Sequence, residues 1–141
     1  MDNRARATGR FSSVTPTFAD LAKAQYILLT TFTKDGRPKP TAIWAAVDGD
    51  RLLVITGGNS WKVKRIRNTS RVTLATCDRR GHPTSEAVEG TAAVLDQSQT
   101  GAVYDAIGSR YGILGWLFNF FSKLRGGMEK NVGLELKVTP A

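Results

Sequence analysis

The sequence predicts a mainly β domain, a small barrel of six antiparallel strands with short helices inserted between them. Three observations predict this class. β-Branched and apolar residues recur in six short runs, Asp-Gly turn signals join the first three runs, and helical patterns fall at only a few places between runs. Because open sheet edges invite aggregation, a set of antiparallel strands of this kind favours closure into a barrel.

The first half of the chain predicts a short helix and three strands joined as a meander. Thr17 precedes an apolar stretch that carries Asp20 in its first turn, which is typical of a helix start. The three strands are expected at residues 26–33, 41–47 and 51–56. Both turns between them contain Asp-Gly, and this pair tolerates the positive φ angles that tight turns demand.

The second half adds the remaining helices and strands. Ser60 follows two glycines and can cap a new helix. Further strands are expected at residues 71–77, 86–95 and 132–138. Helical pieces are expected from Asp96 or Ser98 to about residue 110 and, after Gly112, at residues 114–124. The order of elements therefore places helices after the third and fifth strands.

Length and composition favour one globular domain. The chain has 141 residues, of which 41% are hydrophobic, and no apolar run approaches the ~20 residues that a membrane-spanning helix requires. We expect residues 1–16 to form a flexible tail and residues 17–141 to form the domain, because the first stretch is polar and lacks the apolar core of a secretory signal. The single cysteine, Cys77, excludes an internal disulfide and favours the cytoplasm.

The positive charge of the chain is concentrated in one stretch. The net charge is +8, and residues 59–80 hold seven cations against one carboxylate, Asp78. These cations are Lys62, Lys64, Arg65, Arg67, Arg71, Arg79 and Arg80. Such a stretch favours an anionic partner, either a phosphate-bearing ligand, a lipid headgroup or a nucleic acid; a solvated helix face without a ligand is the alternative.

The helix that begins after Ser60 is a candidate anion site. A helix start offers free N–H groups and a partial positive charge, and Lys62 can add its own charge to the same anion. Hydrogen bonds to charged groups contribute ~1.5–3 kcal/mol each, so a phosphate site alone falls short of micromolar affinity. A ring system must also be buried, and the run Thr41-Ala42-Ile43-Trp44 offers an apolar surface for it. Trp44 can alternatively be a core aromatic.

The chain holds few side chains that could perform catalysis by themselves. One histidine, His82, and one cysteine, Cys77, cannot build a zinc site or a Cys–His dyad. Neither the glycine pattern of dinucleotide-binding folds nor that of phosphate-binding loops is present. We predict no catalytic side chain and no metal ligand, so an enzyme of this sequence would take its reactivity from a cofactor.

An ordered set of short motifs runs along most of the chain. The motifs are Leu28-Leu29-Thr30-Thr31, Asp35-Gly36-Arg37-Pro38, Ile43-Trp44, Asp48-Gly49-Asp50, Thr56, Lys62-x-x-Arg65-Ile66-Arg67 and Arg71-Val72. This order resembles the split β-barrel flavin and deazaflavin oxidoreductases grouped with pyridoxamine-phosphate oxidase, in the branch that depends on coenzyme F420. The resemblance covers roughly residues 18–138.

The resemblance implies a six-stranded split β-barrel, a homodimer with two cofactor sites at its interface, and hydride transfer from reduced F420. It also implies that basic residues after the third strand bind the acidic end of the cofactor and that the second strand lies along its ring. The implied cofactor-binding residues are Thr41, Ala42, Ile43, Trp44, Thr56, Ser60, Trp61, Lys62, Lys64 and Arg65.

Two departures from the family bear on the cofactor. Relatives often carry arginine where this chain has Ser60, which leaves the phosphate contact there to the Ser60 hydroxyl and Arg65. Flavin-binding relatives tend to place cations on the second strand for the FMN phosphate, and Thr41 to Trp44 offers none. The absence of cations from Thr41 to Trp44 argues against FMN. The excess of positive charge at residues 59–80 favours F420, because F420 has an acidic tail.

Other functions remain open at this point. The chain can be an FMN- or tetrapyrrole-binding relative, a cofactor carrier without catalysis, or a basic nucleic-acid-binding module. Single-strand binders place several stacking rings among their cations, and Trp61 is the one aromatic residue in the basic helix. The apolar segment at residues 111–121 can be core or dimer packing, a lid over a lipophilic acceptor such as a quinone, or a peripheral membrane contact.

Overall fold

The computed structural model of the protein describes residues 15–124 and 130–140, without the side chains of residues 113–124. The helices are α2 (Phe18–Lys23), α3 (Trp61–Asn68) and α4 (Thr100–Leu124), with a 3-10 turn, η1 (Gln97–Gln99), before α4. The strands are β1 (Tyr26–Phe32), β2 (Pro38–Ile43), β3 (Ala46–Asp48), β4 (Arg51–Gly57), β5 (Arg71–Cys77), β6 (Val88–Val94) and β7 (Asn131–Val138).

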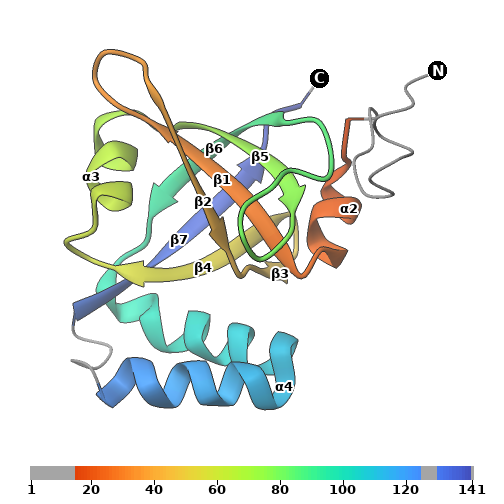
Figure 1. The fold of residues 1–141 in the computed structure, drawn as a ribbon. Coiled ribbons are helices and arrows are strands. Elements are labelled where there is room, and N and C mark those ends of the chain that lie inside the picture. The colour runs from red at the N-terminus through yellow and green to blue at the C-terminus, as the bar shows by residue number, and fades with distance from the viewer. Residues whose placement is uncertain (1–14, 125–129, 141) are drawn as a thin grey trace.

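The strands form one antiparallel sheet in the order β2-β1-β5-β6-β7-β4-β3. The sheet curls into a half-barrel, as Figure 1 shows. β2 and β3 lie at its two edges, although only Trp44 and Ala45 separate them in the sequence. The chain itself therefore passes from one edge of the sheet to the other, and the predicted mainly β barrel class is confirmed.

The number of strands differs from the predicted six. The single strand expected at residues 41–47 is two strands, β2 and β3, and the first of them begins earlier, at Pro38. The reason is the change of partner: β2 pairs with β1, whereas β3 pairs with β4 on the other side of the barrel. At the break, the backbone N–H and C=O of Ala45 bond to the Tyr111 hydroxyl instead of to a strand.

Local chemistry accounts for the starts of α2 and α3 and for the break in α4, whereas the helix expected from Asp96 or Ser98 begins with η1 and becomes α-helical only at Thr100. Thr17 and Asp20 form a reciprocal capping box at the start of α2. The Ser60 hydroxyl caps α3 by accepting a hydrogen bond from the N–H of Val63. Gly112 interrupts α4 with a non-helical backbone, φ 59° and ψ −130°, which separates the two helical pieces expected there.

The core lies inside the barrel, with a second apolar cluster outside it. Along β4 the side chains alternate: Leu52 and Val54 belong to the interior cluster, while Leu53 faces the outer one. The outer cluster joins β3 and β4 to the buried residues Val103 and Ile107 of α4. Figure 1 shows α4 lying along the bottom of the barrel, so this helix covers one outer face of the sheet.

The apolar segment at residues 111–121 begins in the first half of α4 and continues beyond the Gly112 kink. The side chains after Gly112, including Trp116, lie outside the described residues, so its role as packing, lid or membrane contact stays a prediction. Within residues 15–124 and 130–140, no helix has the length and apolar character needed to span a membrane.

Candidate functional site

A pocket of about 290 Å³ lies where the end of β2 meets the start of α3 and the Ile107 region of α4. Its lining residues are Tyr26, Thr41, Ala42, Ile43, Trp44, Ile55, Lys62, Arg79 and Ile107. Five of the predicted cofactor residues, from two separate stretches of the sequence, thus come together here: residues 41–44 and Lys62. The pocket combines apolar walls with two cations, and none of the described residues that line it is a carboxylate.

Trp44 forms a flat aromatic wall of this pocket. Its ring stacks on that of Tyr111, with centroids 4.4 Å apart and planes inclined by 12°. The Tyr111 hydroxyl contacts the carbonyl oxygens of Gln25 (2.9 Å) and Ala45 (3.1 Å) and accepts from the Ala45 N–H (3.2 Å). Because these contacts fix Tyr111, they also fix the ring of Trp44 that rests on it.

Lys62 is the cation that α3 contributes to the pocket. Its side chain is half-buried, and its amine has neither an ion pair nor a hydrogen bond among the described residues. Burial, with a further contribution from the nearby Arg65 guanidinium, lowers the pKa of the Lys62 amine. A half-buried charge without a partner favours an anionic ligand, because that ligand would replace the lost hydration.

The other predicted residues of the basic helix lie outside the pocket wall. The Ser60 hydroxyl is used by its cap, so the Val63 N–H is already satisfied and only the first N–H groups of α3 remain for a ligand. Trp61 is 69% exposed, and the Lys64 amine lies 4.5 Å from the centre of its ring. Thr56 sits in β4, paired with β7.

Arg65 has an internal partner. Its Nε donates a 2.8 Å hydrogen bond to the hydroxyl of Thr31, which is buried. None of the cations of α3 has a carboxylate partner among the described residues, whereas Arg51 and Arg71 elsewhere in the barrel are paired with carboxylates. The positive field of α3 is therefore not neutralised by acidic side chains in the described part of the chain.

Four lining residues were not predicted from the sequence: Tyr26, Ile55, Arg79 and Ile107. Tyr26 was expected only as the first residue of a strand, and Arg79 only as part of the basic stretch. The pairing of Tyr26 with Cys77 brings the two together, because Arg79 follows Cys77 by two residues. This register has no local sequence signal, so sequence reasoning could not find it.

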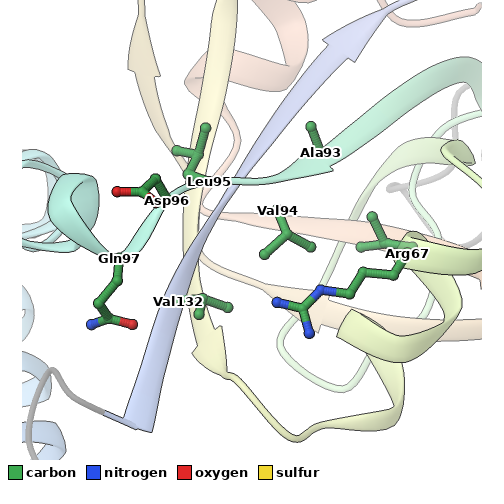
Figure 2. Close-up of a pocket in the computed structure, with 8 residues that line it drawn as sticks. Arg67, Ala93, Val94, Leu95, Asp96, Gln97 and Val132 are labelled. Carbon is green, nitrogen blue, oxygen red and sulfur yellow. The ribbon is translucent and has the colours of Figure 1, made fainter.

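A second, larger hollow of about 530 Å³ lies between α3, β6 and β7. Figure 2 shows Arg67 extending from α3 toward Val94 and Val132 in this hollow. None of the predicted cofactor residues lines it. In the described part of the chain, no three His, Cys, Asp or Glu side chains are grouped so that they could hold a metal ion.

Comparison with known proteins identifies relatives by family and by fold. The family model described as pyridoxamine 5'-phosphate oxidase matches residues 14–139. No curated protein matches the chain. Similar solved structures include a conserved hypothetical protein from Mycobacterium tuberculosis, with 20% identity over 93% of this chain and 86% of that one and a TM-score of 0.66.

Two other similar structures differ in the ligand that their names state. A heme storage protein from Vibrio cholerae has a TM-score of 0.63 and 12% identity over 86% of each chain. An F420 reductase has a TM-score of 0.58 and 22% identity over 90% of this chain and 97% of that one. At these identities the likeness extends to the fold, and the choice of ligand must be argued from the pocket.

Proposed function

Because the chain belongs to the pyridoxamine 5'-phosphate oxidase family, we propose that it is an F420-dependent oxidoreductase. In this proposal the protein holds the deazaflavin in the pocket beside β2 and reduces a small apolar or conjugated acceptor of the quinone type. The fold is shared by an F420 reductase and by a heme storage protein. The argument for F420 therefore rests on the residues of the pocket.

The observation that carries the proposal is the half-buried Lys62 amine, which has no partner among the described residues and lies at the edge of an aromatic-walled pocket. An acidic group bound there would gain a charged hydrogen bond worth ~1.5–3 kcal/mol. A planar ring placed along Trp44 and the apolar side chains Ile55 and Ile107 would supply the apolar burial that the charged contact lacks. The residues present thus fit a ligand with an acidic end and a conjugated ring.

The charge of α3 favours F420 over FMN. Beyond Lys62, the exposed Lys64 and Arg67 have no carboxylate partners among the described residues, so they can attract an acidic tail longer than one phosphate. The pocket wall at Thr41 to Trp44 carries no cation that would hold an FMN phosphate.

Each part of the pocket has a separate task in this proposal. Lys62 binds the acidic end of the cofactor, and Ser60 keeps α3 in place through its cap. Trp44, Ile55 and Ile107 orient the ring and exclude water. The bound reduced deazaflavin supplies a hydride, which is the chemistry that the protein's own side chains do not offer.

We further propose that two copies of the chain complete the site. The pocket of about 290 Å³ is slightly smaller than the range of roughly 300–1,000 Å³ usual for small-molecule sites. A homodimer with the pocket at its interface would enclose more of the cofactor than one chain does. Light scattering of the purified protein tests this: a monomer that binds F420 would contradict the dimer and leave the cofactor proposal standing.

The decisive experiment is a titration with oxidised F420, FMN, hemin and a generic oligonucleotide, each against wild type, Lys62→Ala and Lys23→Ala. Lys23 is an exposed lysine at the end of α2 and serves as the matched control. We expect saturable F420 binding in the low-micromolar range, weakened roughly tenfold or more by Lys62→Ala and unchanged by Lys23→Ala.

The other ligands define the alternatives. FMN binding as tight as F420 binding would favour a flavin protein, and preferential hemin binding would favour a tetrapyrrole protein. Oligonucleotide binding that is tighter than F420 binding and falls with added salt would favour a nucleic-acid-binding module. F420 affinity that is equal in wild type and Lys62→Ala would overturn the assignment of Lys62.

A further inference from the structure

Besides Lys62, the pocket is lined by two more polar side chains, those of Tyr26 and Arg79. Tyr26, the first residue of β1, pairs with Cys77 at the end of β5, and Arg79 lies in the loop that begins just after Cys77. Both side chains line the pocket that Lys62 also lines. In Figure 1, α3, which carries Lys62, lies to the left of β2, and the loop after β5, which carries Arg79, lies to its right.

The Tyr26 hydroxyl is free to bind a ligand. Tyr26 is half-buried, and its hydroxyl has no hydrogen-bond partner among the described residues. The neighbouring phenol, Tyr111, differs in this respect because its hydroxyl is held by Gln25 and Ala45. Of these two phenols, Tyr26 is therefore the one that can donate its hydrogen bond to a bound molecule.

The Arg79 guanidinium is likewise uncommitted among the described residues. The adjacent carboxylate, Asp78, is used within its own loop: one of its oxygens accepts from the N–H groups of Arg80 and His82, both at 2.9 Å, and the other contacts the His82 ring at 3.0 Å. These bonds hold the loop in shape and leave Arg79 to face the pocket.

We propose that the Tyr26 hydroxyl and the Arg79 guanidinium together bind the oxygen atom of the acceptor, and that Tyr26 is the catalytic proton donor to that oxygen. This inference rests on the proposed reductase function and adds the identity of the acceptor site. A hydrogen-bond donor and a cation aimed at one oxygen stabilise the negative charge that this oxygen gains during reduction.

The step balances without any further reagent. The acceptor receives a hydride, that is two electrons and one proton, from the reduced deazaflavin, and its oxygen takes the proton of the Tyr26 hydroxyl. The reduced deazaflavin also releases one proton when it returns to its oxidised form, and this proton, carried by water, restores the Tyr26 hydroxyl. Until then the guanidinium of Arg79 stabilises the phenolate on Tyr26. A site that stabilises an anionic oxygen suits a carbonyl compound or a quinone as the acceptor, because the oxygen of either becomes anionic when the molecule receives a hydride.

The oxygen site can be tested without cofactor. The probe is 4-nitrophenol, whose coloured phenolate imitates a reduced quinone. We expect the wild-type protein to bind the phenolate in preference to the neutral phenol, and Tyr26→Phe and Arg79→Gln each to weaken phenolate binding roughly tenfold or more. Tyr104→Phe is the control, because Tyr104 is buried outside this pocket and bonds to Asn131. Equal phenolate affinity in wild type and in both pocket variants would overturn the proposal.

A second measurement follows turnover of menadione by reduced F420. Tyr26→Phe should lower kcat about a hundredfold or more and leave F420 affinity unchanged. Its remaining rate should fall as the pH rises, since the proton must then come from the solvent. If F420 binds and Tyr26→Phe turns over as fast as wild type, the oxygen site is refuted and the reductase stands. If F420 does not bind, the reductase is refuted, and the phenolate titration still decides the oxygen site.

Discussion

The ring of Tyr111 stacks on the ring of Trp44 at a centroid distance of 4.4 Å. Tyr111 belongs to α4, and Trp44 stands at the break between the two edge strands, so this contact joins the outer helix to the point where the chain crosses the barrel. Arg110 strengthens the same junction by donating hydrogen bonds to the carbonyls of Ala22, Lys23 and Ala24 at the end of α2. The wall of the candidate pocket therefore depends on α4.

Tyr111→Phe tests the hydroxyl at this junction. The substitution keeps the ring on Trp44 but leaves the Ala45 N–H and the Gln25 carbonyl without their partner. We expect the free energy of unfolding to fall by about 1–3 kcal/mol in urea titrations. In Tyr111→Leu the free energy of unfolding should fall by a further ~0.5–1.5 kcal/mol, because the stacking of Tyr111 on Trp44 is also removed. Equal stability of Tyr111→Phe and wild type would show that the hydroxyl contacts do not hold Trp44.

Gly112→Ala tests the kink in α4. Gly112 adopts φ 59° and ψ −130°, a conformation that L-residues with a side chain rarely take. We expect the substitution to lower the free energy of unfolding by about 1–3 kcal/mol. Gly101→Ala, in the same helix, is the matched control: an added methyl there meets open space, and the variant should be unchanged or slightly more stable. A Gly112→Ala protein as stable as Gly101→Ala would rule out a strained kink.

Lys62→Met tests the cost of the half-buried amine. The pKa of Lys62 is lowered by burial and by Arg65, so the charged amine is less favourable in the folded than in the unfolded protein. At pH 7, Lys62→Met should unfold at a higher urea concentration than wild type. This advantage should shrink as the pH rises toward the ordinary lysine pKa of 10.5, because the folded protein loses its proton first. A difference that is constant from pH 7 to 10 would contradict the assigned burial.

Asp78→Asn tests the loop that carries Arg79. Hydrogen bonds from the His82 backbone, the His82 ring and the Arg80 N–H lower the pKa of Asp78 to about 2. The stabilisation from this carboxylate is therefore present above pH 3.8 and is lost as the pH falls through about 2. Wild type should exceed Asp78→Asn in stability at pH 7, and the two should converge between about pH 4 and 2.

Hydrogen exchange gives an independent check of the same loop. In Asp78→Asn the amides of Arg80 and His82 should exchange faster than in wild type, because a neutral amide oxygen accepts their hydrogen bonds more weakly than the charged carboxylate oxygen does. If their exchange is unaltered in the variant while the convergence at low pH is absent, the carboxylate does not organise the loop.

Local elements of the fold could be predicted from the sequence. The strand expected at residues 71–77 has those bounds, Ser60 caps α3, and Gly112 divides α4. Each of these depends on neighbouring residues: a run of β-branched side chains, a hydroxyl at a helix start, or a residue able to adopt positive φ. The split of residues 38–48 into β2 and β3 could not be predicted, because it depends on strands that are distant in the sequence.

The candidate site likewise combines features that the sequence predicts with features that only the structure reveals. The sequence by itself determined which stretches carry the charge and the apolar run, namely the helix after Ser60 and residues 41–44. Only the tertiary structure decided that Lys62 faces those residues and that Tyr26 and Arg79 join them, through the pairing of β1 with β5. Helix caps and turns follow from contacts a few residues apart, whereas a pocket depends on strand register and on the burial that the whole barrel imposes.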